Sequence, residues 1–260
     1  MNYSLLLAGL AAAFFVLLLI AMQIGKWLGR GADEKSGSGA AVIEGSVFAL
    51  LGLLVAFTFS GAAQRMAERR DLLVQEVNAI GTAWLRIDMM ETGIQPRLRD
   101  QFRRYVDERI NYYRNVADLE RRDAIAAHVG ALQKEIWTTS MQAARASVPP
   151  FAASYVGAVN EMFDVASAQT VAQKVHPPIA AYVFLGFLTL VAAGLVGLNL
   201  ASSKRNTLLH QVVYAIVMTT ALYIIVDFEF PRIGTIRIDQ SDALLVSQRQ
   251  SMVDPVGGGS

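Results

Sequence analysis

The sequence predicts an all-α membrane protein with four transmembrane helices and a helical extramembrane bundle between the second and the third. Two observations lead to this fold class. The chain contains four separate apolar blocks of about 20 residues, the length that crosses a bilayer. Between blocks two and three, roughly 110 residues carry apolar side chains at helical spacing, and no stretch alternates long enough to predict a sheet. Of the 260 residues, 53% are hydrophobic, more than in an ordinary soluble domain.

The first apolar block, residues 5–22, is interpreted as a membrane span. It has no basic segment before it and no small-residue cleavage site after it, so it does not fit a signal peptide. The other three blocks are residues 41–63, 179–200 and 208–230. Each has no charge, or a charge only at its margin, which is typical of membrane helices.

The second block is predicted to continue as one uninterrupted helix over residues 44–88. Charged residues follow its membrane half, and apolar residues then recur at three- and four-residue steps without a proline. At 1.5 Å per residue this helix is about 65–70 Å long, whereas a bilayer core takes up only ~20 residues. The remainder projects into water, and we expect the extramembrane bundle to be built on it.

Three more helices complete the predicted bundle, at residues 97–116, 120–146 and 151–175. Gly93 and Pro96 mark the break before the first of them, and Pro149 with Pro150 the break before the last. The remaining segments are predicted as a flexible loop at residues 31–40, a polar hairpin at 199–206, an irregular piece at 232–238 and a terminal helix at 240–252. We expect transmembrane helices in 1–63 and 177–231, an extramembrane domain in 64–176, a tail in 232–255 and an appended linker in 256–260.

The membrane half of the long helix has three faces when residues are stepped by ~100°. The first consists of small residues, which allow helices to approach closely in lipid: Gly45, Ala49, Gly52, Ala56 and Ala63. The second carries Leu50, Leu53 and Phe57 and suits lipid or another helix. The third repeats at steps of four and three, is apolar in the middle and is charged at both ends: Glu44, Phe48, Leu51, Val55, Thr58, Ala62, Arg65 and Arg69.

This third face has two interpretations. In the first, it packs against the chain's own helices, and Glu44 and Arg65 lie at that interface. In the second, copies of the face from several subunits line a pore, in which Arg65 and Arg69 draw anions and Glu44 forms an opposing ring. Ionisable groups at membrane depth usually face protein or water, so both interpretations accommodate Glu44.

Residues for catalysis are hard to find. The chain has no cysteine, and its histidines, His128, His176 and His210, lie in separate segments without metal-type partners. Its net charge of +1 gives no reason to expect nucleic acid as a partner. We therefore expect no enzyme activity.

Asp227 and Glu229 at the end of the fourth span are the most unusual polar feature. One interpretation is an ion pair with Arg232, Arg237 or an arginine of the long helix. The other is a cation or gating site, because two carboxylates with neighbouring carbonyls suit Ca²⁺. No other cofactor is expected.

Residues 44–57, 76–86 and 227–234 resemble a bacterial membrane-protein family of unknown function whose members are often labelled bestrophin-like. The resemblance covers nearly the whole chain and implies the same layout of two spans, a helical domain and two spans. Bestrophins themselves are pentameric channels with a pore lined by the second span and a calcium clasp after the fourth. The dense acidic clasp and the neck pattern of bestrophins are absent from this sequence.

Together these features lead us to expect a homo-oligomeric ion channel in the bacterial inner membrane, most simply a pentamer, with the second span lining its pore. Its partners would be other copies of itself, the lipid bilayer and inorganic ions. The alternative is a non-conducting membrane scaffold or sensor whose helical domain binds a partner.

Overall fold

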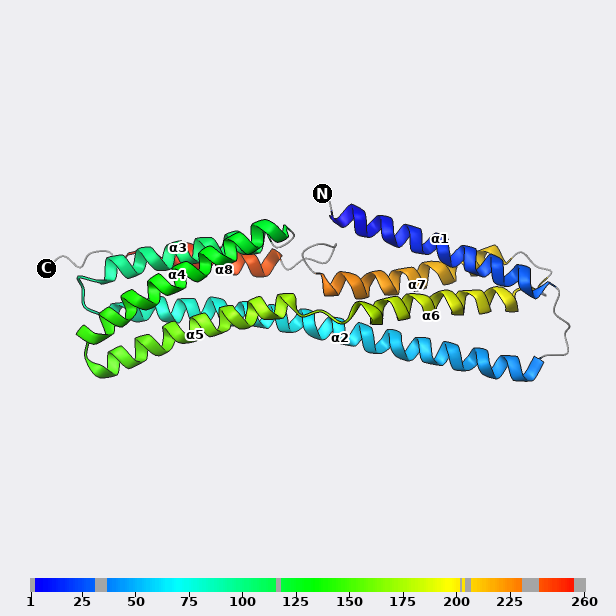
Figure 1. Cartoon of the computed structure of the whole chain (residues 1–260), viewed down its shortest axis with the longest axis horizontal. Coiled ribbons are helices and arrows are strands. Elements are labelled where there is room, and N and C mark those ends of the chain that lie inside the picture. The colour runs from blue at the N-terminus through cyan, green and yellow to red at the C-terminus, as the bar shows by residue number, and fades with distance from the viewer. Residues whose placement is uncertain are drawn as a thin grey trace. The chain divides into compact units, whose positions relative to one another are not determined.

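The structure, a computed structural model, describes residues 3–30, 37–115, 118–201, 203, 207–230 and 239–254. Within these ranges all regular secondary structure is helical, and no strand is present (Figure 1). The helices are α1 (Tyr3–Gly29), α2 (Gly37–Arg86), the 3-10 helix η2 (Ile87–Met89), α3 (Gln95–Arg114), α4 (Leu119–Ala146), α5 (Pro149–Lys174), α6 (Ile179–Asn199), α7 (Leu208–Glu229) and α8 (Asp239–Ser251). The predicted all-α class is confirmed.

The long helix is confirmed as well. α2 runs without interruption over 50 residues and contributes to two compact units. The first unit comprises Met1–Met66 and His176–Ile236, and the second comprises Ala67–Val175 and Arg237–Ser260. The domain boundaries expected from the sequence stay a prediction. The loop at 31–36, most of the hairpin, the piece at 232–238 with Arg232 and Arg237, and the linker at 256–260 lie outside the described residues.

Among the described residues, four helices are long and apolar enough to cross a membrane, as predicted. The candidate segments are Ser4–Gly29, Ala41–Met89, Pro149–Asn199 and Leu208–Glu229. The third includes α5 as well as α6, and its uncharged part is α6. In the most apolar 18-residue stretch of α2, only 6% of the residues are buried within the chain. The membrane half of α2 therefore presents most of its surface to lipid or to another chain.

A backbone-to-backbone contact between α1 and α6 holds these two helices of the first unit together. A Cβ atom placed on Gly25 would lie 2.0 Å from the carbonyl oxygen of Gly194, and one on Gly197 would lie 2.0 Å from that of Met22. Glycine is required at these positions because any side chain would push the helices apart. The sequence prediction assigned close packing to the small residues of α2 and missed this contact, although Gly25-x-x-x-Gly29 and Gly194-x-x-Gly197 have suitable spacing.

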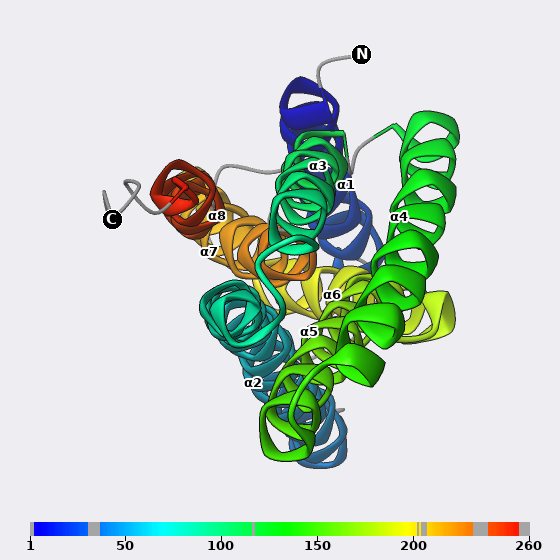
Figure 2. The ribbon, with the colours of Figure 1, turned by 90° about the vertical axis from the view of Figure 1, so that its left-hand side faces the viewer.

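The second unit packs α3, α4, α5 and α8 with the second half of α2; Figure 2 views these helices nearly end on. Its core is built from large side chains that are almost fully buried: Leu73, Ile80, Trp84, Phe102, Tyr105, Ile136, Tyr155 and Met162. Local signals set the helix starts. Pro96 and Pro149 occupy the first turns of α3 and α5, and the Asp118 carboxylate accepts a hydrogen bond from the Arg121 amide at 3.1 Å.

Candidate functional site

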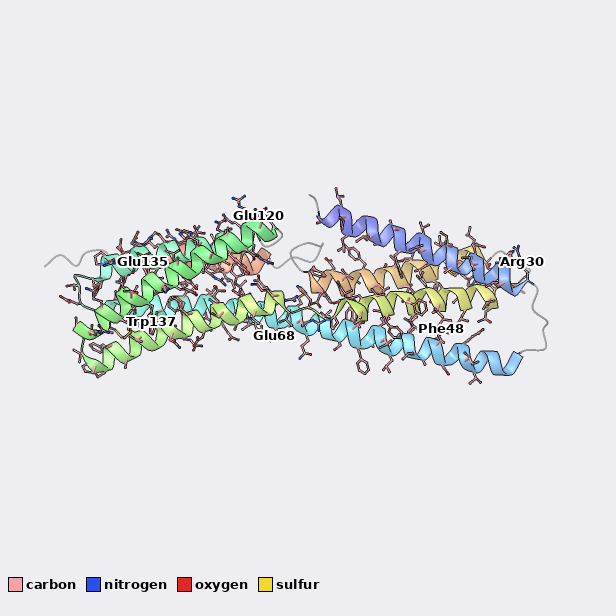
Figure 3. All side chains as sticks on the ribbon, in the orientation of Figure 1. Arg30, Phe48, Glu68, Glu120, Glu135 and Trp137 are labelled. Atoms are coloured by element: carbon pink, nitrogen blue, oxygen red, sulfur yellow. The ribbon has the colours of Figure 1, made fainter. Side chains whose placement is uncertain are left out.

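The third face of α2 packs against the chain's own helices. Leu51 and Ala62 are buried in a cluster with Leu185 and Leu188 of α6 and Ile225 of α7. Phe48 and Val55 pack against the same cluster, and Figure 3 marks Phe48 on the side of α2 that faces α6. This is the arrangement of the first interpretation. Leu51 and Ala62 cannot line a pore in this conformation, because their side chains are buried among the chain's own helices.

The polar residues of that face are also engaged within the chain. The Thr58 hydroxyl donates to the Leu54 carbonyl at 2.7 Å, so it is used by its own helix. The Glu44 carboxylate accepts a hydrogen bond from the Asn199 side-chain amide at 2.7 Å. The Glu44 contact ties the face to α6, whereas the Thr58 hydroxyl is satisfied within its own helix.

Arg65 of α2 is paired with Glu229 at the end of α7. Arg65 Nη2 lies 2.8 Å from a carboxylate oxygen of Glu229, whose side chain is fully buried. His176 Nδ1 lies 3.0 Å from the other carboxylate oxygen, and the His176 ring stacks on Phe230 with centroids 4.7 Å apart. A buried carboxylate needs such partners, since an unpaired buried charge is strongly destabilising. The ion-pair interpretation therefore describes Glu229, with Arg65 as its partner.

This arrangement does not fit a Ca²⁺ site. Calcium takes six to eight oxygen ligands, whereas Glu229 is already bound by a guanidinium and an imidazole. Asp227 is buried as well. In the described part of the chain, no three His, Asp or Glu side chains form a group suited to a metal. We derive no calcium chemistry from Asp227 and Glu229.

Arg69, the last residue of the third face, belongs to the second unit and is 4% exposed. Its guanidinium donates to the carbonyl oxygens of Ala172 at 3.0 Å and Val175 at 3.1 Å, at the end of α5. A cation at a helix C-terminus satisfies carbonyls that lack helical partners. Arg69 is thus a capping residue for α5.

The opposite side of α2 is exposed within the part of the chain that the structure describes. In the described part of the chain, no atom lies within 4 Å of a Cβ added at Gly45 or Gly52, so the small-residue face is open at these two positions. Contact of Gly45, Ala49, Gly52, Ala56 and Ala63 with another copy stays a prediction. Exposed residues also follow one line at steps of three and four along this side, which we call the outward line: Ser46, Ala49, Leu53, Ala56, Ser60, Gln64, Ala67 and Asp71.

The outward line differs chemically from a lipid-facing surface. Seven of its eight members are small or polar, and Leu53, which is 52% exposed, is its bulky apolar member. Lipid contact favours large apolar side chains, and a polar amide such as that of Gln64 is costly there. Sequence reasoning separated three faces of α2 but did not identify the outward line. The line becomes apparent only when it is known which side chains of α2 are exposed.

A buried ion pair joins α2 and α3 in the second unit, and sequence reasoning missed it. Arg109 of α3 binds Glu76 of α2 with two hydrogen bonds, the longer of them 2.9 Å, and Tyr113 also donates to Glu76. Both charged side chains are at most 3% exposed. Burial alone would lower the pKa of Arg109, but the attractions of Glu76, Tyr113 and Tyr105 together outweigh it and hold that pKa well above its usual range. Burial also raises the pKa of the neighbouring Tyr105 to about 12.

The fold and its apolar helices define a four-span α-helical membrane protein with a helical extramembrane unit. A family model described as the Bestrophin-like domain matches residues 6–243, and the chain belongs to this bestrophin-like family. The predicted family is thereby confirmed.

Among solved structures, the chain is similar to a crystal structure of a bacterial bestrophin homologue from Klebsiella pneumoniae that carries a tyrosine-to-alanine mutation. The two chains are 14% identical and superimpose with a TM-score of 0.66 over 92% of this chain and 96% of the other. At this identity the likeness concerns the fold. A comparison with curated proteins finds no match.

Proposed function

We propose that the chain is one subunit of a homo-oligomeric ion channel, a pentamer in the bacterial inner membrane, whose pore is lined by α2. Family membership and the bestrophin fold support a channel over a scaffold. The observation that carries the proposal is the exposed outward line of α2, which is small and polar where lipid contact would favour large apolar side chains. If copies of α2 surround a common axis, their outward lines face a central pore that contains water and ions.

This lining replaces the third face of α2 that the sequence suggested. The third face is occupied by α6 and α7 within each subunit, whereas the outward line is open. In the proposed pore the small residues of the outward line leave space for ions. Leu53 forms the narrowest apolar ring, which can stop conduction by excluding water.

The small-residue face overlaps the outward line at Ala49 and Ala56, and in this proposal its other side, with Gly45 and Gly52, supplies the subunit contact. Without bulky side chains, neighbouring copies of α2 approach closely, which is how helices associate in lipid. Tight packing of α2 against its copies would also cover the apolar surface that one chain leaves exposed.

The test combines native mass spectrometry of the detergent-solubilised particle with conductance in planar bilayers. We expect a closed ring of subunits and a conductance that rises when Leu53→Ser removes the apolar ring. Leu50→Ser is the matched control, because Leu50 is a leucine of similar exposure, 45% against 52% for Leu53, about 60° away around the helix, and its replacement leaves the ring intact. A closed ring that never conducts, with or without Leu53→Ser, contradicts the proposal.

The second candidate function is a non-conducting scaffold or sensor whose helical unit binds a partner. The groove between α3 and α8, lined by Ile110, Tyr113, Leu245 and Val246, is the observation that favours it. A monomer in mild detergent would support this function, because a single copy of α2 cannot enclose a pore.

A further inference from the structure

We propose that the C-terminal end of α1 binds the headgroup and one acyl chain of an anionic phospholipid. This site is independent of ion conduction, because it lies on the exposed side of α1 and involves no residue of α2. Three observations carry it: an apolar groove on α1, two cations beside that groove without a counter-charge, and hydrogen bonds from α7 that hold one of the cations in place.

An open groove of about 350 Å³ runs along the exposed side of α1. Its lining is apolar except for Gln23, and it consists of Val16, Leu19, Ile20, Gln23, Ile24 and Trp27. The rise from Val16 to Trp27 is about 16 Å at 1.5 Å per residue. This is close to half of the ~30 Å hydrocarbon thickness of a bilayer, so the groove matches the depth of one leaflet and suits an acyl chain.

Two cations lie where this groove ends. One side of α1, with the turn that follows it, carries two residues of the groove and then both cations at steps of four, three and four residues: Leu19, Gln23, Lys26 and Arg30. Trp27 lies between the cations in sequence and is 68% exposed. Exposed tryptophan is typical of the level of the lipid headgroups. We therefore expect Lys26 and Arg30 at the depth of the phosphate groups, with the groove leading from them toward the bilayer centre.

Neither cation has a carboxylate partner in the described part of the chain. The exposed side chain of Arg30 makes no hydrogen bond or ion pair there. The Lys26 ammonium donates to the Thr207 hydroxyl at 3.2 Å, which leaves two of its three N–H donors for a ligand. Two cations without a counter-charge attract an anion, and a guanidinium can bind a phosphate through two parallel hydrogen bonds.

Hydrogen bonds from α7 and its N-cap residue Thr207 position the polar part of the site. The Gln23 amide donates to the Gln211 side-chain oxygen at 3.2 Å, and the Gln211 amide donates to the Thr207 hydroxyl at 3.4 Å. Gln211 and Thr207 are both buried. Because Thr207 also accepts from Lys26, these buried groups hold a groove residue and a cation next to each other. A site that is already positioned loses less entropy when its ligand binds.

An anionic phospholipid satisfies both parts of the site with one molecule. Its phosphate meets the two cations, and its acyl chain fills the groove. A zwitterionic phospholipid fills the groove equally well but brings no net negative charge. Each basic residue near an anionic membrane surface strengthens binding about fivefold. Lys26 and Arg30 together should therefore favour phosphatidylglycerol over phosphatidylcholine by about tenfold or more.

The experiment uses Trp27 as a reporter in the full-length protein. The protein is reconstituted in phosphatidylcholine vesicles that contain a minor fraction of brominated lipid, either phosphatidylglycerol or phosphatidylcholine, because brominated chains quench tryptophan on contact. We expect brominated phosphatidylglycerol to quench several-fold more strongly. Trp27→Phe should abolish this difference, since the chain's other tryptophans, Trp84 and Trp137, belong to the second unit. The difference should also weaken at 1 M salt, where the Debye length shortens to about 3 Å.

The double variant Lys26→Gln with Arg30→Gln should make the two brominated lipids quench Trp27 equally. Its matched control is Lys134→Gln with Arg145→Gln, which removes two exposed cations of α4 and changes the net charge by the same amount. We expect this control to keep the preference within twofold of the wild type.

Equal quenching of wild-type Trp27 by the two lipids overturns the proposed site, and so does a preference that survives Lys26→Gln with Arg30→Gln. Equal loss of the preference in both double variants also overturns it, because the net charge of the protein would then be the cause. The proposed channel stands in each of these cases, since no step of the experiment depends on conduction.

Discussion

Arg65 of α2 and Glu229 of α7 form a salt bridge of 2.8 Å in which the carboxylate is fully buried and the guanidinium is about one quarter exposed. This pair joins two helices whose sequence positions are far apart, and His176 adds a third segment to it. The pair also decides how α2 is oriented, because it fixes the third face of α2 toward α7.

The first prediction concerns this pair. Glu229→Ala leaves Arg65 and His176 without their carboxylate, and we expect it to cost about 2–5 kcal/mol of stability. Thermal unfolding in detergent measures the loss, and Arg104→Ala, which breaks an exposed ion pair, should cost about 1 kcal/mol or less. In the double variant Glu229→Gln with Arg65→Gln, part of the loss should be recovered. Equal losses for Glu229→Ala and Arg104→Ala would contradict the burial of the pair.

The second prediction concerns the contact of α1 with α6. Gly197→Ala places a Cβ atom 2.0 Å from the carbonyl oxygen of Met22, so the helices must separate. We expect a loss of about 1–3 kcal/mol, as for other overpacked positions. Gly130→Ala is the control, because a Cβ there meets no atom within 4 Å and alanine favours the helix by roughly 0.5–1 kcal/mol. A stabilising Gly197→Ala would show that α1 and α6 are not in backbone contact.

The third prediction concerns assembly through the small-residue face. Gly52→Leu adds a large side chain where the subunit itself has open space, so the fold of one subunit should change little. If copies of α2 pack through this face, the variant should assemble into smaller particles, as measured by native mass spectrometry. Gly157→Leu on α5 is the control and should keep the wild-type mass. An unchanged mass for Gly52→Leu would exclude this face from the subunit contact.

The fourth prediction concerns pH. A hydrogen bond from Gln101 at 2.9 Å, together with Arg104, lowers the pKa of Glu135 below its usual 4.5. Because the folded pKa is lower than the unfolded one, this contribution is complete above pH 4.5 and is lost as pH falls through the folded pKa. Wild type should therefore be more stable than Glu135→Gln at pH 6, and the two should converge as pH falls toward 3.

The effect of Glu135 should be small, because exposed ion pairs contribute about 1 kcal/mol or less. Thermal unfolding of both variants between pH 3 and pH 7 measures it. Glu161→Gln, which changes an exposed glutamate on α5 outside this cluster, controls for the general loss of charge. If the difference in stability between wild type and Glu135→Gln grew as pH fell, it would contradict the lowered pKa of Glu135.

Much of the fold could be predicted because its signals are local. The length of the apolar blocks identified the four spans, and the absence of proline from residue 44 to residue 88 predicted a continuous α2. Pro96 and Pro149 marked where new helices begin. Such signals survive without tertiary contacts, since bilayer thickness and backbone geometry impose them on each segment separately.

The candidate site could be predicted only in part. Helical periodicity separated the faces of α2, but a repeat of three and four residues has the same form whether a face meets another helix, lipid or water. The burial of Leu51 and Ala62 and the exposure of Ser60 and Asp71 were needed to tell the faces apart. The contact of Gly25 with Gly194 required knowing which helices are neighbours.

The sequence by itself determined the class of the protein: four apolar helices, a long second helix and a helical extramembrane part, all imposed by the length and spacing of apolar residues. Only the tertiary structure decided which groups remain available for function. Arg65 and Arg69 look like free cations in the sequence, yet one is neutralised by Glu229 and the other caps α5. The reason is that charge acts through distance and dielectric, and both depend on segments that lie far apart in the chain.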